Sequence, residues 1–152
     1  MDITCRFIGD SAVLDLTGRF VVSAGEAETL PFRSAVGRLI TEGRIHVALN
    51  LAGLESIDAR GLGELVSTLT TLRRCGGEMT LIAPRAVVRK MLSVTRLDTV
   101  FHFCDSELEA TRRLPRAVPS LEHRSIAKGW AGHALVSSVA STRIMSLVDQ
   151  WR

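Results

Sequence analysis

Hydrophobic and polar positions divide the first part of the chain into short strands and a helix. Residues 3–18 (ITCRFIGDSAVLDLTG) alternate apolar and polar side chains and break at Gly9-Asp10. This pattern predicts two antiparallel strands joined by a tight turn. Residues 23–40 repeat apolar positions at near-helical spacing and predict a helix, in which Pro31 indicates a kink or a later start.

The middle of the chain combines a buried strand with an amphipathic helix. Residues 45–51 (IHVALNL) are a continuous apolar run rich in branched side chains, typical of a central strand covered on both faces. Residues 58–77 predict a helix that is stopped by Gly76-Gly77. Its apolar stripe comprises Leu62, Leu65, Val66, Leu69 and Leu72.

Strands and helices continue to alternate after this helix. Residues 78–83 predict a strand, and Pro84 is well placed as the first residue of a helix that reaches about Val94. Residues 99–103 predict a last short strand, and residues 105–113 a closing helix. The predicted buried face of the helix after Pro84 comprises Val87, Val88, Met91 and Leu92. The order predicts an α/β fold, with a mixed sheet of mainly parallel later strands and helical crossovers.

The last part of the chain has a different character. Pro115 and Pro119 bracket a basic linker, and residues 130–151 carry a loosely amphipathic pattern. We therefore predict one domain over residues 1–113, followed over residues 114–152 by the linker and a C-terminal helix. That helix is expected to pack on the domain or on a second copy of the chain.

Charge and composition exclude several classes of function. Residues 113–152 hold 6 basic and 2 acidic side chains, whereas residues 1–112 hold 13 and 14. A nearly neutral main domain without tyrosine argues against a nucleic-acid-binding surface. The chain has no apolar run of about 20 residues, and MDITCRFIGD lacks the layout of a signal peptide. We expect a cytoplasmic protein without membrane insertion.

Cysteines and histidines indicate neither a disulfide framework nor a metal site. The cysteines, which are odd in number and lack a CxxC pair, are Cys5, Cys75 and Cys104. The histidines, none of which has metal-ligand spacing, are His46, His102, His123 and His133. We expect reduced thiols that behave as small hydrophobic side chains, isolated structural histidines, no metal and no cofactor.

The junction that follows the buried strand, residues 55–65 (ESIDARGLGEL), is the most informative stretch. Gly61-Leu62-Gly63 fits neither GxGxxG nor GxxxxGK[ST], which argues against a phosphate site. No nucleophile elbow and no paired histidine and carboxylate support catalysis, so we expect no catalytic residue. Asp58 fits the N-cap of the helix. The small residues after it either expose the helix start to a partner or permit close packing, and spacing leaves both interpretations open.

Residues 45–103, together with the hairpin before them, resemble the STAS-domain family of bacterial anti-sigma factor antagonists. The most specific features are Asp58 with the GLG after it, the Gly-Gly before the next strand and Leu97-Asp98 before the last strand. The resemblance covers roughly residues 3–112 and implies a STAS-like mixed sheet of about four to five strands, with helices mainly packed on one face.

Family members typically carry Asp, Ser, Ser or Thr and then Gly-Leu at this junction. In the family, a partner that is both kinase and anti-sigma factor phosphorylates the serine directly after the aspartate. Asp58, Gly61 and Leu62 match this motif, whereas Ala59 occupies the phosphoacceptor position and Arg60 follows it. Asn50 stands where the family often has an aspartate.

The resemblance implies a non-catalytic regulatory module that captures an anti-sigma factor of the GHKL kinase type through residues 56–66. With alanine at the phosphoacceptor position, the domain should resemble the permanently unphosphorylated form. The residues expected to bind the partner are Ser56, Asp58, Ala59, Arg60, Gly61, Leu62 and Gly63. The alternative is a STAS subunit of a stress-sensing complex or of a lipid-transport ATP-binding cassette system, which would contact another STAS-binding protein. The sequence is also compatible with a homodimer in either case.

Overall fold

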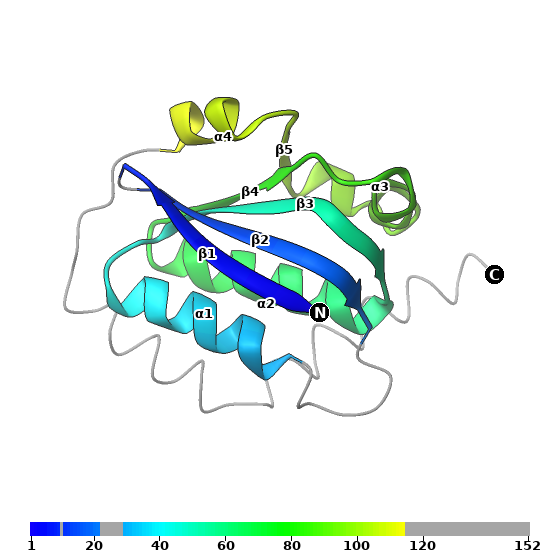
Figure 1. Cartoon of the computed structure of the whole chain (residues 1–152), viewed down its shortest axis with the longest axis horizontal. Coiled ribbons are helices and arrows are strands. Elements are labelled where there is room, and N and C mark those ends of the chain that lie inside the picture. Colours follow the sequence, from blue (N-terminus) through cyan, green and yellow to red (C-terminus); the bar gives the residue numbers. More distant parts are fainter. Residues whose placement is uncertain (10, 22–28, 115–152) are drawn as a thin grey trace.

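The computed structural model describes residues 1–9, 11–21 and 29–114, and these form one five-stranded sheet with four α-helices (Figure 1). The strands are β1 (Asp2–Ile8), β2 (Ser11–Phe20), β3 (His46–Ile57), β4 (Glu78–Ile82) and β5 (His102–Cys104). The helices are α1 (Leu30–Thr41), α2 (Ala59–Arg74), α3 (Ala86–Val94) and α4 (Glu107–Arg113), with a short 3-10 helix at Leu97–Thr99. β1 is antiparallel to β2, and the other neighbours are parallel in the order β1-β2-β3-β4-β5. This arrangement confirms the predicted mixed α/β fold.

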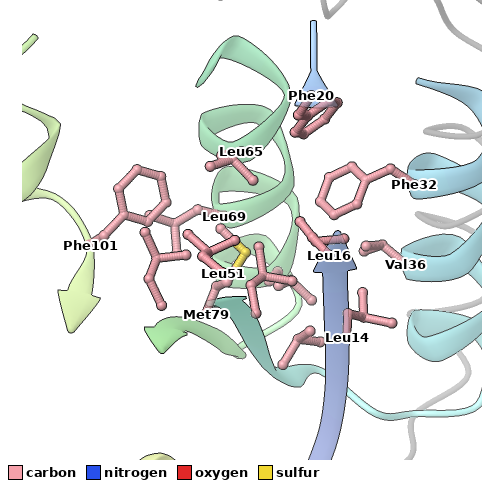
Figure 2. Close-up of a cluster of buried hydrophobic side chains, with 14 of the residues drawn as sticks. Leu14, Leu16, Phe20, Phe32, Val36, Leu51, Leu65, Leu69, Met79 and Phe101 are labelled. Carbon is pink, nitrogen blue, oxygen red and sulfur yellow. The ribbon is translucent and has the colours of Figure 1, made fainter. Parts of the chain in front are cut away.

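The main hydrophobic core lies between the sheet and the layer formed by α1 and α2, which Figure 1 shows below the strands. α3 adds Val88 and Leu92 to the same core, so three of the four described helices pack on one face. Figure 2 shows leucines of β2 and β3 directed toward α2, and Phe20 beside Phe32 of α1. The ring centroids of these two phenylalanines are 5.5 Å apart, a favourable tilted contact.

α4 covers part of the opposite face of the sheet. There Ala48 of β3 packs with Ala110 and Leu114 in a smaller cluster. Val47 and Leu49, the neighbours of Ala48 along β3, belong to the main core. Side chains of a strand alternate between its faces, so β3 is covered on both, as its continuous apolar run predicted.

Two strands run beyond their predicted ends. β2 continues to Phe20, although the pattern predicted its end at Gly18. Gly18 has φ +82°, and the register with β3 shifts directly after it, so this glycine accommodates an irregularity inside the strand. β3 continues past Leu51 to Ile57, because the end of β2 pairs with it up to that residue.

The predicted start and buried face of the third helix were also wrong in part. Pro84 lies before α3, which begins at Ala86 because Arg85 still has an extended backbone. Val87 is 62% exposed, since the helix turns only its Val88 side fully toward the core. The last strand begins later than predicted, at His102, because a 3-10 helix occupies the preceding residues.

Some predictions fall on residues outside the described ranges, namely the first part of the helix predicted from residue 23 and the C-terminal helix at 130–151. The described α1 begins at Leu30 with Pro31 in its first turn, where the missing N–H costs no helical hydrogen bond. Among the described residues, no helix combines the length and apolar character needed to cross a membrane.

Candidate functional site

Asp58 caps α2, as its position in the sequence predicted. Its backbone is extended (φ −99°, ψ 178°), and its Oδ1 accepts a hydrogen bond from the Gly61 N–H at 2.7 Å. The Asp58 N–H donates to the carbonyl oxygen of Phe20 at 3.2 Å. Asp58 therefore satisfies one of the free N–H groups of the first helical turn and also connects the helix start to the end of β2.

Gly61 lies against the end of β2 too closely for a side chain. A Cβ at this position would be 2.7 Å from the carbonyl oxygen of Phe20 and 2.8 Å from Cγ1 of Ile57. Real Cβ atoms essentially never approach other atoms this closely, so an alanine here would push α2 away from the sheet. The glycine therefore permits close packing, which was one of the two interpretations left open by the sequence.

The seven residues predicted to bind a partner differ in exposure. The buried ones are Gly61, Leu62 and Gly63, and Leu62 belongs to the main core. The half-buried ones are Ser56, Asp58 and Ala59, and Arg60 is exposed. We call Asp58, Ala59 and Arg60 the helix-start surface, because these side chains are accessible where α2 begins. Gly61 to Gly63 lie behind this surface and determine its position.

The helix-start surface carries no hydroxyl group. Ala59, which the resemblance to the family motif aligned with the phosphoacceptor, has only a methyl group. Ser56 is the nearest hydroxyl residue in the sequence, and its Oγ is buried and has no hydrogen-bond partner in the described structure. In this conformation Oγ of Ser56 is not accessible to a phosphorylating enzyme.

A buried ion pair, which the sequence analysis missed, joins α2 to α1. Arg33 of α1 donates from Nε to Glu64 Oε2 at 2.9 Å and from Nη2 to Oε1 at 3.3 Å. The side chains are only 8% and 3% exposed. Two hydrogen bonds in this arrangement fix both angle and distance, so the pair holds the first turns of α2 against α1. The only signal in the sequence was a charged residue within an apolar stretch of each predicted helix.

A second polar cluster lies on the face of the sheet that carries α4. Arg6 of β1 bonds to both Asp15 of β2 and Glu107 of α4, and Asn50 donates to Asp15 Oδ1 at 2.7 Å. The Arg6 guanidinium, together with the Asn50 amide, holds the pKa of Asp15 below its usual value. Asn50 also accepts a hydrogen bond from the Ala52 N–H at 3.1 Å. An ionised aspartate at position 50 could not donate to Asp15, which explains the asparagine.

Histidines and cysteines form no metal site in the described ranges. His46 is buried, and burial lowers its pKa because the charged imidazolium is less well solvated there. His46 lines an open cavity of about 480 Å³ with Glu78, Thr80 and His102, at the end of β3 opposite to the helix-start surface. Cys75 and Cys104 are buried as expected, whereas Cys5 is exposed.

Comparison with known proteins identifies relatives of one type. A Thermotoga maritima protein named as an anti-sigma factor antagonist is 32% identical over 77 residues, which are 51% of this chain and 68% of that protein. A homologue from Thermotoga neapolitana is 34% identical over 71 residues, 47% of this chain and 63% of the relative.

Solved structures share the fold. The crystal structure of an anti-sigma factor antagonist from Thermotoga maritima superposes with a TM-score of 0.66 at 26% identity, covering 75% of this chain and 95% of that one. Unphosphorylated SpoIIAA superposes with a TM-score of 0.61 at 20% identity, with coverages of 74% and 95%. The family match spans residues 12–110, from β2 to α4, and the chain therefore belongs to the STAS domain family.

Proposed function

We propose that this protein is a non-catalytic regulatory module of the anti-sigma factor antagonist type. The main support for the proposal is that the chain belongs to the STAS family and that its relatives are named as anti-sigma factor antagonists. The capped start of α2 supports it, because Asp58 and Gly61 of the family motif are both present and both have a defined structural task. We place the protein in the cytoplasm, where an anti-sigma factor acts.

The proposed partner is an anti-sigma factor of the GHKL kinase type, and the proposed contact is the helix-start surface. Asp58, Ala59 and Arg60 are accessible there, whereas Gly61 to Gly63 contribute by letting α2 approach the sheet. Ser56 lies beside this surface with its hydroxyl turned inward. A contact held in place by a cap, a close glycine packing and a buried ion pair loses little conformational entropy on binding, which favours affinity.

The proposed interaction differs from that of typical family members in its regulation. Ala59 cannot accept a phosphate, so the kinase activity of the partner does not end the interaction at this position. The amount of protein, contacts of residues 114–152 or a phosphate at another residue would then control sigma release. The described structure is compatible with this regulation, because the neighbouring Ser56 hydroxyl is buried.

We also propose that residues 1–113 form the complete binding domain and that residues 114–152 are an appendage. α4 ends at Arg113, and Ala110 of α4 together with Leu114, the residue that follows the helix, completes the small cluster on the second face. A chain truncated after Leu114 should retain the cooperative thermal transition of the full chain. An insoluble or unfolded truncation product would show that the last residues belong to the core.

The absence of a hydroxyl at Ala59 is also the observation that favours a second candidate function. A STAS subunit of a stress-sensing complex or of a lipid-transport ATP-binding cassette system needs no phosphoacceptor, and its junction would serve packing alone. Its partner would be another STAS protein or a transporter ATPase rather than a kinase. The identity of the captured protein distinguishes these two functions.

The proposed function can be tested with two matched aspartate variants on α2. Ala59→Asp adds a carboxylate to the helix-start surface, and Thr70→Asp adds one to an exposed position further along the same helix. After pull-down identifies the anti-sigma factor, calorimetry should show strong loss of affinity for Ala59→Asp only, since an unpaired charge buried in a contact costs several kcal/mol. Equal affinities for both variants and wild type would exclude the helix-start surface as the contact.

A further inference from the structure

β1 is an edge strand, and no described strand pairs with its outer side. It is the first strand in the sheet order, and it pairs with β2 from Asp2 to Ile8 without a register shift. Ile3 is half-buried, and all other residues of β1 are exposed. Proteins usually protect such edges with Pro, Lys, a bulge or a very short strand. The sequence DITCRFI has neither Pro nor Lys, and its one cation, Arg6, is bonded to Asp15 and Glu107.

The hairpin geometry identifies the backbone groups that point outward. Ile8 pairs with Ser11 across a two-residue loop, in which Gly9 has φ +60°, and a loop of this kind is closed by a hydrogen-bonded pair. Hydrogen-bonded and non-hydrogen-bonded pairs alternate along an antiparallel ladder. The N–H and C=O groups of Ile3, Cys5 and Phe7 therefore point away from β2 and toward the open edge.

The same three residues form one row of apolar side chains on the α1 face of β1. Ile3 packs against the main core, and the Arg44 guanidinium lies 4.3 Å from the centroid of the Phe7 ring. Phe7 nevertheless remains 52% exposed, and Cys5 between these two is exposed as well. Outward backbone groups and exposed apolar side chains thus coincide on Ile3, Cys5 and Phe7, with Cys5 at the centre of the strand.

We infer that two copies of this chain pair through antiparallel β1 edges about a two-fold axis at Cys5, forming one continuous sheet. In this register Ile3 lies opposite Phe7 of the second copy, and the two Cys5 residues lie opposite each other. All three pairs are of the hydrogen-bonded kind, so each exchanges two backbone hydrogen bonds. The apolar row of one copy continues into the row of the other, which buries surface that is exposed in the single chain.

The number of backbone pairs along the strand favours this register over its neighbours. Arg6 faces Thr4 of the second copy, and its diagonal neighbours at about 7 to 8 Å are Asp2 and Arg6 of that copy, so no charge lies directly opposite another of the same sign. A two-fold axis at Arg6 would place two guanidinium groups directly opposite each other. An axis at Thr4 would place Arg6 opposite Asp2 and Phe7 opposite Met1 of the second copy, but it would keep only two hydrogen-bonded pairs within β1, Ile3 with Cys5 and its symmetry equivalent. The axis at Cys5 is thus the symmetric register with the most pairs and no opposed like charges.

The test uses the full chain under reducing conditions. Light scattering across a concentration series should give a mass that approaches twice the 16.6 kDa of one chain. Cys5→Lys and Cys5→Glu each place two like charges at the axis and should each remain at the single-chain mass. An equimolar mixture of the two variants should regain the double mass, because opposite charges then meet. Thr70→Lys, on exposed α2 surface away from β1, should behave as wild type.

A second measurement reports the register directly. Diamide, an azo oxidant that takes up two protons and two electrons, should convert the two Cys5 thiols into one disulfide between chains. Cys5→Ser should abolish this crosslink, whereas Cys75→Ser should keep it because Cys75 is buried. A single-chain mass for wild type at every concentration overturns the inference. A double mass that persists in both charged Cys5 variants also overturns it, since a different surface must then hold the copies together.

Discussion

Replacing Gly61 by alanine tests whether α2 is as tightly packed against the sheet as the structure indicates. The new methyl group would lie 2.7 Å from a backbone oxygen of Phe20, which can move only if β2 or α2 moves. Overpacking of this kind costs about 1 to 3 kcal/mol. Alanine in a helix gains about 0.5 to 1 kcal/mol over glycine. The net effect should be a loss of about 0 to 2.5 kcal/mol in the free energy of unfolding.

Gly37 of α1 provides a matched control for this substitution. It is also a buried glycine within a helix, but a Cβ built there meets nothing within 4 Å. Gly37→Ala should therefore stabilise the protein by about 0.5 to 1 kcal/mol through helix propensity alone. Urea denaturation of both variants measures the two changes. If Gly61→Ala were as stable as Gly37→Ala, the close approach of α2 to Phe20 would be wrong.

Three further predictions concern the helix-start surface and the two polar clusters. Ala59→Ser should keep wild-type affinity for the partner, and incubation of the wild-type chain with the partner kinase and ATP should leave Ala59 unmodified in peptide mass spectra. Glu64→Gln removes the buried carboxylate that binds Arg33 through two hydrogen bonds and should cost about 3 to 5 kcal/mol in urea denaturation, whereas Arg33→Met combined with Glu64→Leu should recover most of that loss. The lowered pKa of Asp15 implies stability that is present above the usual carboxyl value of about 3.9 and lost as the pH falls through the lower folded value. Melting curves between neutral and acidic pH should show a smaller acid-dependent loss for Arg6→Ala than for wild type.

The local features of the junction could be predicted from the sequence. The Asp58 cap depends only on residues within one helical turn, and the stripe of α2 depends on helical spacing, so both were found. The role of Gly61 depends on Phe20, which is distant in the sequence and is brought near by the parallel pairing of β2 with β3. Spacing could therefore not separate packing from partner exposure.

The polar clusters could not be predicted for the same reason. Arg33 and Glu64 lie on different helices, and their contact depends on how α1 and α2 pack. Asn50 was recognised as a departure from the family motif, but its partner Asp15 becomes apparent only from the pairing of Asp15 with Asn50 across β2 and β3. The exposure of Val87 likewise depends on the face that α3 turns toward the core.

The structure also separates two properties that the family motif combines, namely the position of the helix start and its capacity for phosphorylation. Asp58 and Gly61 determine where α2 begins relative to β2, and neither contact involves the side chain of Ala59. A side chain without a hydroxyl at position 59 therefore leaves the contacts of Asp58 and Gly61 in place. A methyl group there also introduces no polar atom that would need a hydrogen-bond partner in a contact. If the helix-start surface binds an anti-sigma factor, a chain with alanine instead of serine at position 59 still binds this partner. Phosphorylation at position 59 can then no longer dissociate the complex.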